Sequence, residues 1–249
     1  MVKQGETLPT KIAQNMLQRI VSDEFPPGSL LPSERELQDN YQVSRAVVRE
    51  AIKLLASRKL ITISRGQGAV VTSDFTEPVL DALLLAFHRS QIHAEDIYSV
   101  RKFLEPQAAA LAAQHATIQQ IRRLSDLASK FETISFDIEA ADNDTSFVQW
   151  GKFDVEFHTL LAEASQNTVL SILISVLVGV IWNAVSSKMP TPTHDRFKIA
   201  VQQHKAITLA VAQHDAEGAR QTMIEHIETS LHNVVNPEKR VDIEIGNLI

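Results

Sequence analysis

Residues 30–71 have the sequence LLPSERELQDNYQVSRAVVREAIKLLASRKLITISRGQGAVV, which predicts two helices joined by a short turn and followed by a β-hairpin. Ser33 and Glu36 have the spacing of a capping box, in which a hydroxyl and a carboxylate satisfy the free backbone amides at the start of a helix. Ser44 can cap a second helix, which continues to about Ser57. This order of elements is typical of a helix-turn-helix unit.

Further elements are expected on both sides of this unit. Upstream, apolar residues recur at helical spacing from Leu8 and predict a helix that ends before Pro26. Downstream, the β-branched runs 60–64 and 69–72 flank a glycine-rich tip, which predicts a hairpin. Three helices and a hairpin together predict an N-terminal winged helix-turn-helix.

The second helix of the unit is expected to have one apolar face and one basic face. Arg45, Arg49 and Lys53 repeat every fourth residue, opposite an apolar stripe. The major groove of DNA admits one α-helix whose first turns reach base edges, so Arg45 and Arg49 are candidates for bidentate contacts to guanine. The alternative is a solvated basic face, but helix, turn, capped helix and hairpin occur here together and favour DNA binding.

Other residues near this helix are candidates for contacts to the DNA backbone. Arg35 is better placed for a phosphate or an outer base. Arg65 and the amide of Gly66 could reach a phosphate or the narrow minor groove, where a missing Cβ permits close approach. The candidate DNA-binding residues are Arg35, Ser44, Arg45, Arg49, Arg65 and Gly66.

Residues 8–72 resemble the DNA-binding domain of the GntR family of bacterial transcription regulators, especially its FadR-type branch. The resemblance rests on PPGSLLPSERELQDNYQVSRAVVREAIKLLASRKLITISRGQGAVV, which matches the family almost without gaps. It implies contacts with operator DNA by Arg35, Arg45, Arg49 and Gly66. One departure is that Ala46 and Val47 stand where many relatives have Thr or Ser, so the preferred bases within the operator stay open.

Length and composition fit two globular domains. The chain has 249 residues, 44% of them hydrophobic, and no cysteine, which excludes disulfides and thiolate metal sites. Charged residues interrupt any apolar run at the N-terminus, so we expect no signal peptide and a cytoplasmic location. The net charge of −6 divides into +2 for residues 1–76 and −8 for the rest. DNA affinity must therefore come from a local basic patch, and from two copies acting together.

Residues 164–187 contain no charged side chain and raise the question of a membrane span. A span needs roughly 20 predominantly apolar residues, whereas several serine, asparagine and glutamine side chains interrupt this stretch. We therefore expect a fully buried helix at the centre of the second domain, and no membrane contact.

The chain beyond residue 77 shows helical periodicity without strand-like alternation. It predicts an antiparallel bundle of six or seven helices, interrupted by loops at 135–146 and 186–195. The fold class is therefore mostly α. The expected divisions are a winged helix-turn-helix domain with its linker at 1–76, an all-helical metal-binding, effector-binding and dimerising domain at 77–235, and a tail at 236–249.

Four polar side chains lie among apolar residues of the predicted helices, namely Asp154, His158, His204 and His226. Asp154 and His158 are four residues apart, so they point the same way from one helix. One carboxylate oxygen and three imidazole nitrogens from three helices are suited to a divalent metal ion. A single buried histidine is more often a hydrogen-bonded core residue than a ligand, and spacing alone leaves both alternatives open.

Arg101 follows Ile97 by four residues and is expected on the same inward side of its helix. A buried guanidinium needs an anionic partner, because unpaired burial of a charge costs about 3–5 kcal/mol. The partner is either Glu105 or another internal carboxylate, or else the carboxylate of a bound ligand, which the planar arginine fork matches bidentately. The residues alone leave these alternatives open.

The C-terminal half is similar to the FCD effector domain of FadR-type regulators, mainly through VRKFLEPQAAALAA, DVEFHTLLAEAS and HKAITLAV. An aspartate and three histidines bind metal in many members. The resemblance therefore implies a divalent ion, with zinc expected and nickel or manganese as alternatives, at Asp154, His158, His204 and His226. It also implies that Arg101 lines the effector cavity and binds an organic acid, such as a sugar acid, beside the metal.

These expectations combine into a homodimeric, acid-responsive repressor that binds a palindromic operator. The alternative is a metal-dependent hydrolase fused to a DNA-binding module, since three histidines and an aspartate also occur in hydrolytic centres. Such an enzyme needs a positioned general base, yet Glu156 and Glu163 do not share the helix face of Asp154. We therefore favour the regulator and expect no enzymatic activity.

Overall fold

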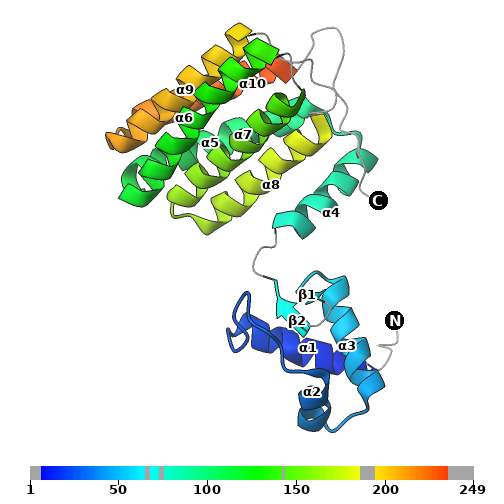
Figure 1. Cartoon of the computed structure of the whole chain (residues 1–249). Coiled ribbons are helices and arrows are strands. Elements are labelled where there is room, and N and C mark those ends of the chain that lie inside the picture. The colour runs from blue at the N-terminus through cyan, green and yellow to red at the C-terminus, as the bar shows by residue number, and fades with distance from the viewer. Residues whose placement is uncertain (1–6, 65–67, 73–75, 142–143, 186–193, 235–249) are drawn as a thin grey trace. The chain divides into compact units, whose positions relative to one another are not determined.

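The structure of the chain is a computed structural model, which describes residues 7–64, 68–72, 76–141, 144–185 and 194–234 (Figure 1). The chain forms two compact units, Met1–Pro78 and Val79–Ile249. Two candidate DNA-binding residues, Arg65 and Gly66, lie outside the described residues, and so does the tail 236–249.

The first unit consists of three helices followed by a two-stranded sheet. Its elements are α1 (Leu8–Val21), α2 (Glu34–Tyr41), α3 (Arg45–Ser57), β1 (Ile61–Ser64) and β2 (Gly68–Val71). The strands pair antiparallel, with Ile61 opposite Val71 and Ser64 opposite Gly68. Gly68 has a φ of 95°, which residues with a Cβ rarely adopt, so glycine suits the start of β2. The predicted winged helix-turn-helix is confirmed.

One apolar core joins the three helices to the hairpin. Met16, Leu37, Val48 and Leu55 are completely buried, and Ile61 of β1 packs with them. Burial of a side chain of this size stabilises the fold by about 1.5–3 kcal/mol. Because α3 uses this face for the core, its opposite face is left to solvent.

The two predicted helix caps have different outcomes. The capping box at α2 is confirmed: Glu36 N donates to Ser33 Oγ at 3.3 Å, and Ser33 N donates to the Glu36 carboxylate at 2.7 Å. Ser44 is the residue before α3, but the predicted side-chain cap is wrong, because its side chain makes no capping hydrogen bond. The amides of Val47 and Val48 donate to the backbone carbonyl of Ser44 instead, which leaves the hydroxyl without that role.

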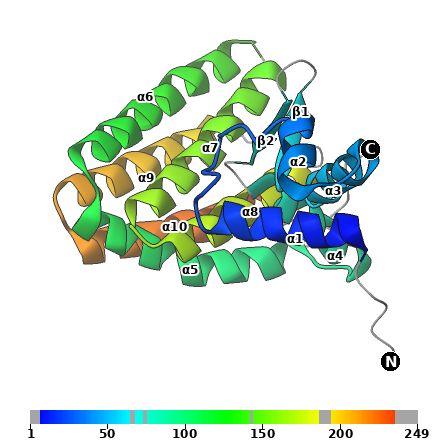
Figure 2. The same ribbon diagram turned by 90° about the horizontal axis from the view of Figure 1, so that it is seen from below.

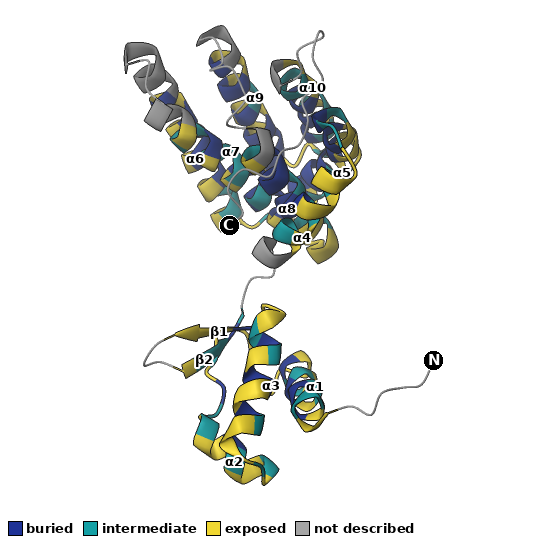
Figure 3. Cartoon of the chain, turned by 90° about the vertical axis from the view of Figure 1, so that its right-hand side faces the viewer, coloured by how far each residue is buried: buried dark blue, intermediate teal, exposed yellow. Residues whose placement is uncertain are grey.

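The second unit is a bundle of seven helices within the described residues. They are α4 (Thr76–Arg89), α5 (Ala94–His115), α6 (Ile118–Ala141), α7 (Asp144–Ala164), α8 (Thr168–Val185), α9 (His194–Ala212) and α10 (Ala216–Val234). Helix α5 lies at the centre, since it packs against α7, α8, α9 and α10. Figure 2 shows the long helices lying side by side, and Figure 3 shows their buried residues on the sides that face one another. The predicted helical bundle is confirmed.

The two predicted interruptions of the bundle differ from the structure. The loop predicted at 135–146 is wrong over most of its length, because α6 continues to Ala141 and α7 begins at Asp144. This stretch contains neither glycine nor proline, the two residues that most disfavour a helix interior, so its polar residues are compatible with helix up to Ala141 and again from Asp144. Of the second predicted loop, residues 186–193 lie outside the described residues, and α9 begins at His194.

Helix α8 corresponds to the uncharged stretch. Val176, Val178 and Val180 are buried on the sides that pack against α5 and α7. The expectation of complete burial is wrong, because Val169 is 66% exposed and Ile172 is 48% exposed on the remaining side. Among the described residues, no helix has the length and apolar character required to cross a bilayer.

Gly151 permits the close approach of α7 to α8. A Cβ built on Gly151 would lie 1.9 Å from ring atoms of Trp182, far inside contact distance. We expect Gly151→Ala to destabilise the protein by about 1–3 kcal/mol, as overpacking does in other cores. Urea unfolding measures the change, and the same Gly151→Ala substitution made in a Trp182→Leu background should cost much less, because the clashing ring is gone. An alanine variant as stable as wild type would contradict this packing.

Candidate DNA-binding surface and metal centre

Helix α3 presents two arginines on the face that the core does not use. Val48, Ala51 and Leu55 are buried on one side. The side chains of Arg45 and Arg49 are 69% and 60% exposed on the other. Because they are four residues apart, they project from the same face of the helix. This placement agrees with the predicted apolar and basic faces of α3.

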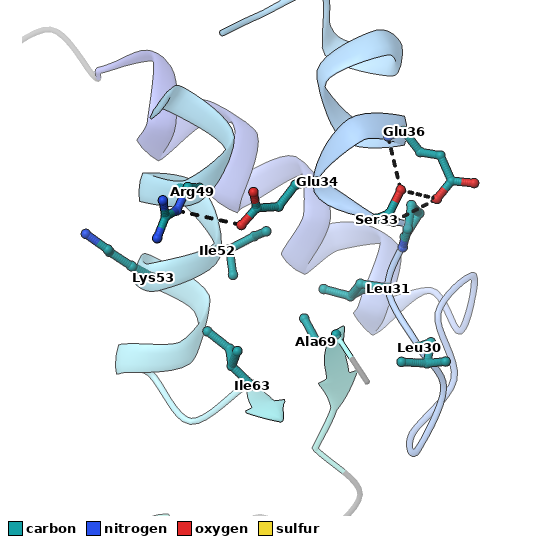
Figure 4. A pocket seen from close by; sticks show the side chains of 12 residues that line it. Leu30, Leu31, Ser33, Glu34, Glu36, Arg49, Ile52, Lys53, Ile63 and Ala69 are labelled. Carbon is teal, nitrogen blue, oxygen red and sulfur yellow. Dashed lines mark hydrogen bonds and ion pairs between the residues drawn. The ribbon is translucent and has the colours of Figure 1, made fainter. Parts of the chain in front are cut away.

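The other candidate DNA-binding residues within the described part of the chain are also exposed. Arg35 is the second residue of α2, and Ser44 precedes α3. The structure adds Glu34, which the sequence did not single out. Its carboxylate accepts a hydrogen bond from Arg45 Nε at 2.8 Å and lies 3.7 Å from Arg49 Nε. Figure 4 shows Glu34 and Arg49 beside a groove between α2, α3 and the hairpin.

The structure brings the four predicted metal ligands together in the second unit. Helix α7 supplies Asp154 and His158, α9 supplies His204 and α10 supplies His226. One ligand atom from each residue lies within 4.8 Å of the others. His158 Nε2 and His226 Nε2 are 3.2 Å apart, and Asp154 Oδ1 is 3.3 Å from His204 Nε2.

The surroundings of these residues favour metal-binding protonation states. Burial lowers the pKa of His204 and lowers that of His226 further, so both imidazoles are neutral near pH 7 and keep a lone pair for a metal. Burial by itself would raise the pKa of Asp154. The neighbouring histidines outweigh that effect, and the pKa of the carboxyl lies well below its usual range. The site therefore offers one anion and at least two neutral nitrogen donors.

Contacts with residues outside the cluster fix the orientation of each histidine ring. His158 Nδ1 lies 2.5 Å from Glu105 Oε2, and His226 Nδ1 lies 3.1 Å from the side-chain oxygen of Gln203. The ring of His204 stacks on Phe131 with their centroids 4.3 Å apart. Such contacts hold the Nε2 atoms toward a common point. Gln203 was not predicted, because one glutamine beside a histidine carries no signal in the sequence.

The donor set fits a divalent cation. Ligand atoms that lie about 2.0–2.1 Å from a tetrahedral ion are roughly 3.3 Å from one another. The distances between His158 Nε2 and His226 Nε2, 3.2 Å, and between Asp154 Oδ1 and His204 Nε2, 3.3 Å, are close to this value. Both ring nitrogens of His204 are buried and lack a well-aligned hydrogen bond, although Nε2 lies 3.3 Å from Asp154 Oδ1. Coordination of a metal by Nε2 would satisfy that atom. The side chain of Asp154 is 22% exposed, whereas the three histidines are buried.

Arg101 is buried, as its position after Ile97 predicted, with only 2% of its surface exposed. Of the two kinds of partner that the sequence left open, the structure has Glu105, whose Oε1 accepts from Arg101 Nε. The guanidinium also lies over the ring of Tyr98, 4.9 Å from its centroid. Burial would raise the pKa of Glu105, but the charges of Arg101 and His158 outweigh it and lower the pKa to about 2. Glu105 is thus a charged link between Arg101 and His158.

Known proteins match both halves of the chain. Residues 8–71 match the model of bacterial regulatory proteins of the gntR family, and residues 96–229 match the FCD domain. The chain is 29% identical over 224 residues to the HTH-type transcriptional repressor NanR of Escherichia coli K12, covering 88% of this chain and 81% of that protein. NanR of Shigella flexneri matches to the same extent. The structure of Streptococcus agalactiae GntR is similar with a TM-score of 0.69 and 25% identity, covering 90% of this chain and 99% of that one.

Proposed function

The chain belongs to the GntR family of bacterial regulatory proteins, in its FadR-type branch with an FCD domain, and from this we propose that it is a repressor controlled by a small carboxylic acid. DNA binding and transcription regulation come with the family. Its relatives are regulators and not enzymes, so the hydrolase alternative is not favoured. The observation that carries the proposed control is the convergence of Asp154 and three histidines on one point.

The proposed DNA contacts come from the exposed face of α3 and its neighbours. Arg45 and Arg49 contact base edges in the major groove, where arginine pairs bidentately with guanine. Arg35 contacts a phosphate or an outer base, Ser44 lies at the start of α3, and the wing residues Arg65 and Gly66 contact a phosphate or the narrow minor groove. The support for this arrangement is the strong exposure of Arg45 and Arg49 on a helix whose other face is core.

The proposed ligand site is the metal cluster. Asp154, His158, His204 and His226 would hold a divalent ion, with zinc expected and nickel or manganese as alternatives. A bound ion offers positions where carboxylate and hydroxyl oxygens replace water. A hydroxy acid or sugar acid suits such positions. Arg101, which lies next to the cluster through Glu105 and His158, is the proposed partner for the effector's negative charge.

Control of DNA binding requires that the effector prefer one arrangement of the protein over another. In the proposed mechanism, residues 77–235 bind the effector and form a homodimer, and residues 1–76 of each copy bind one half of a palindromic operator. Effector binding changes the separation of the two DNA-binding domains and weakens operator affinity. Two weakly basic domains acting together also explain how a chain of net charge −6 binds DNA.

The decisive experiment is a thermal-shift screen of organic and sugar acids, with and without chelator, followed by operator titrations. A ligand present at 100 times its dissociation constant stabilises the folded protein by about 2.7 kcal/mol. We expect one class of acid to raise the melting temperature only with metal present, and to weaken operator binding. Operator affinity unchanged by every acid and by chelator would refute the proposed control.

Loss of one ligand should abolish the response to metal. We expect wild-type protein at saturating zinc to be stabilised by about 2.7 kcal/mol or more relative to chelator-treated protein. His226→Ala should show little or no difference between the two conditions, because one of the four donors is gone. The matched control is His232→Ala on the same helix, since His232 is exposed. Equal zinc responses in the two variants would contradict the proposed ligand set.

A further inference from the structure

Glu34 contacts both arginines that α3 is proposed to place in the major groove. Its Oε2 accepts a hydrogen bond from Arg45 Nε at 2.8 Å, and its Oε1 lies 3.7 Å from Arg49 Nε. One carboxylate therefore holds one arginine on each oxygen. Figure 4 shows Glu34 on α2 and Arg49 on α3 directed toward each other. Glu34 is 36% exposed, so this contact lies at the surface that faces the proposed DNA.

We propose that Glu34 is a specificity-determining positioning residue, which holds Arg45 and Arg49 in the conformations that match operator bases. The inference rests on the proposed function of these two arginines. Neither contact uses the terminal amino groups of the guanidinium, because both involve Nε. Those amino groups are the ones that pair with O6 and N7 of guanine. Glu34 can thus stay in place while both arginines contact bases.

Preorganisation is the first way in which Glu34 favours the operator. Arg45 and Arg49 are long and mostly exposed, and fixing such a side chain on binding costs rotamer entropy. Glu34 is the first residue of α2, directly after Ser33, whose capping box fixes the start of that helix. A carboxylate on a fixed backbone reduces the number of conformations that the two arginines lose when they bind.

The negative charge of Glu34 is the second way in which this residue favours the operator over other sequences. Attraction of arginine to phosphate is independent of sequence and supplies most non-specific DNA binding. A carboxylate beside both guanidinium groups weakens that attraction for every duplex. Only the operator offsets the loss, because only there do both arginines gain base contacts. Glu34 therefore disfavours wrong sequences, as repulsive elements do in other specific interfaces.

The two effects act on different affinities. Loss of the negative charge should raise affinity for every duplex, whereas loss of preorganisation should lower affinity for the operator alone. Wild-type protein first enriches a duplex from a random-sequence pool, and each variant is then titrated with the enriched duplex and with the starting pool. We expect Glu34→Gln to bind the pool more tightly, with a salt dependence steeper by up to about one phosphate contact. The ratio of the two affinities should fall by roughly three- to tenfold, the range expected for loss of two exposed ion pairs.

Two further variants separate position from charge. Glu34→Asp keeps the charge but is too short to reach both arginines, so the ratio should fall while affinity for the pool stays unchanged. Glu50→Gln removes an exposed carboxylate from α3 that pairs with Lys53 at 3.5 Å. It should raise both affinities together and leave the ratio unchanged. Thermal unfolding confirms that each variant is folded.

The outcomes distinguish this inference from the function on which it rests. If wild-type protein enriches a duplex but Glu34→Gln keeps the wild-type ratio, Glu34 does not determine specificity and the inference is overturned. The inference is also overturned if Glu34→Gln lowers affinity for the enriched duplex and for the pool by the same factor. That result is expected if the substitution only destabilises α2. If wild-type protein enriches no duplex, the proposed docking of α3 fails first.

Discussion

Replacing Glu105 by glutamine is expected to destabilise the protein by about 3–5 kcal/mol, the usual result of removing one partner of a buried ion pair. Arg101 and Glu105 are each 2% exposed. The variant keeps the shape of the side chain, but it leaves the guanidinium of Arg101 buried without its anion. Glu105 also contacts His158, so the same change removes the group that orients one proposed metal ligand. Urea unfolding of chelator-treated protein measures the first effect separately from the second.

An exposed ion pair between α5 and α10 provides the control for this prediction. Lys102 of α5 pairs with Glu228 of α10, and their side chains are 48% and 54% exposed. Glu228→Gln should change stability by no more than about 1 kcal/mol, because solvent screens the pair. In the double variant Arg101→Met with Glu105→Gln, part of the lost stability should return, since no uncompensated charge remains. Equal losses for Glu105→Gln and Glu228→Gln would show that burial of the first pair has no energetic consequence.

Zinc affinity provides a second measurement on the same variant. Loss of a contact that orients a ligating histidine typically lowers metal affinity by about 10- to 100-fold. Glu105→Gln should therefore bind zinc more weakly than wild type while retaining all four proposed donors. His158 would keep its Nε2 but lose the negative charge at Nδ1. This result would connect the Arg101 and Glu105 pair to the metal centre, whereas unchanged affinity would limit the pair to a role in stability.

The sequence predicted the DNA-binding unit well because its signals are local. The Ser33 and Glu36 capping box, the apolar stripe of α3 and the glycines of the hairpin each act within a few residues along the chain. Such interactions leave a spacing that can be recognised without a structure. The exposed arginines follow from the same periodicity, since the core takes the opposite face.

The features that the sequence did not reveal depend on contacts between distant elements. Gln203 bonds to His226 on another helix, and Glu105 of α5 reaches His158 of α7. No spacing in the sequence encodes such pairs. Glu34 and Arg45 are separated by eleven residues and a turn, so their ion pair depends on how α2 packs on α3. The loop predicted at 135–146 was wrong over most of its length for another reason: polar residues without glycine or proline are compatible with a helix, and here α6 continues to Ala141 and α7 begins at Asp144.

Alanine at Arg45 or Arg49 is expected to lower affinity for the enriched duplex by about 5- to 150-fold, or about 1–3 kcal/mol, the cost of one bidentate guanine contact. Because the lost contact is to a base, the preference at that position of the site should relax as well. Both side chains are exposed, so neither change should affect folding. Titration against single-base variants of the duplex measures both effects.

Arg35→Ala separates recognition of bases from attraction to the backbone. Arg35 is exposed on α2, outside the helix proposed to enter the groove, so its loss should weaken binding to all duplexes by a similar factor. The slope of log affinity against log salt should become shallower by about 1, because one fewer phosphate is neutralised. If Arg45→Ala and Arg49→Ala gave this pattern and left base preference intact, α3 would lie along the backbone and not in the major groove. Relaxed preference at one position of the site in each of those variants, together with a purely salt-dependent effect of Arg35→Ala, would place α3 in the groove, because loss of a base contact relaxes the preference at the contacted position.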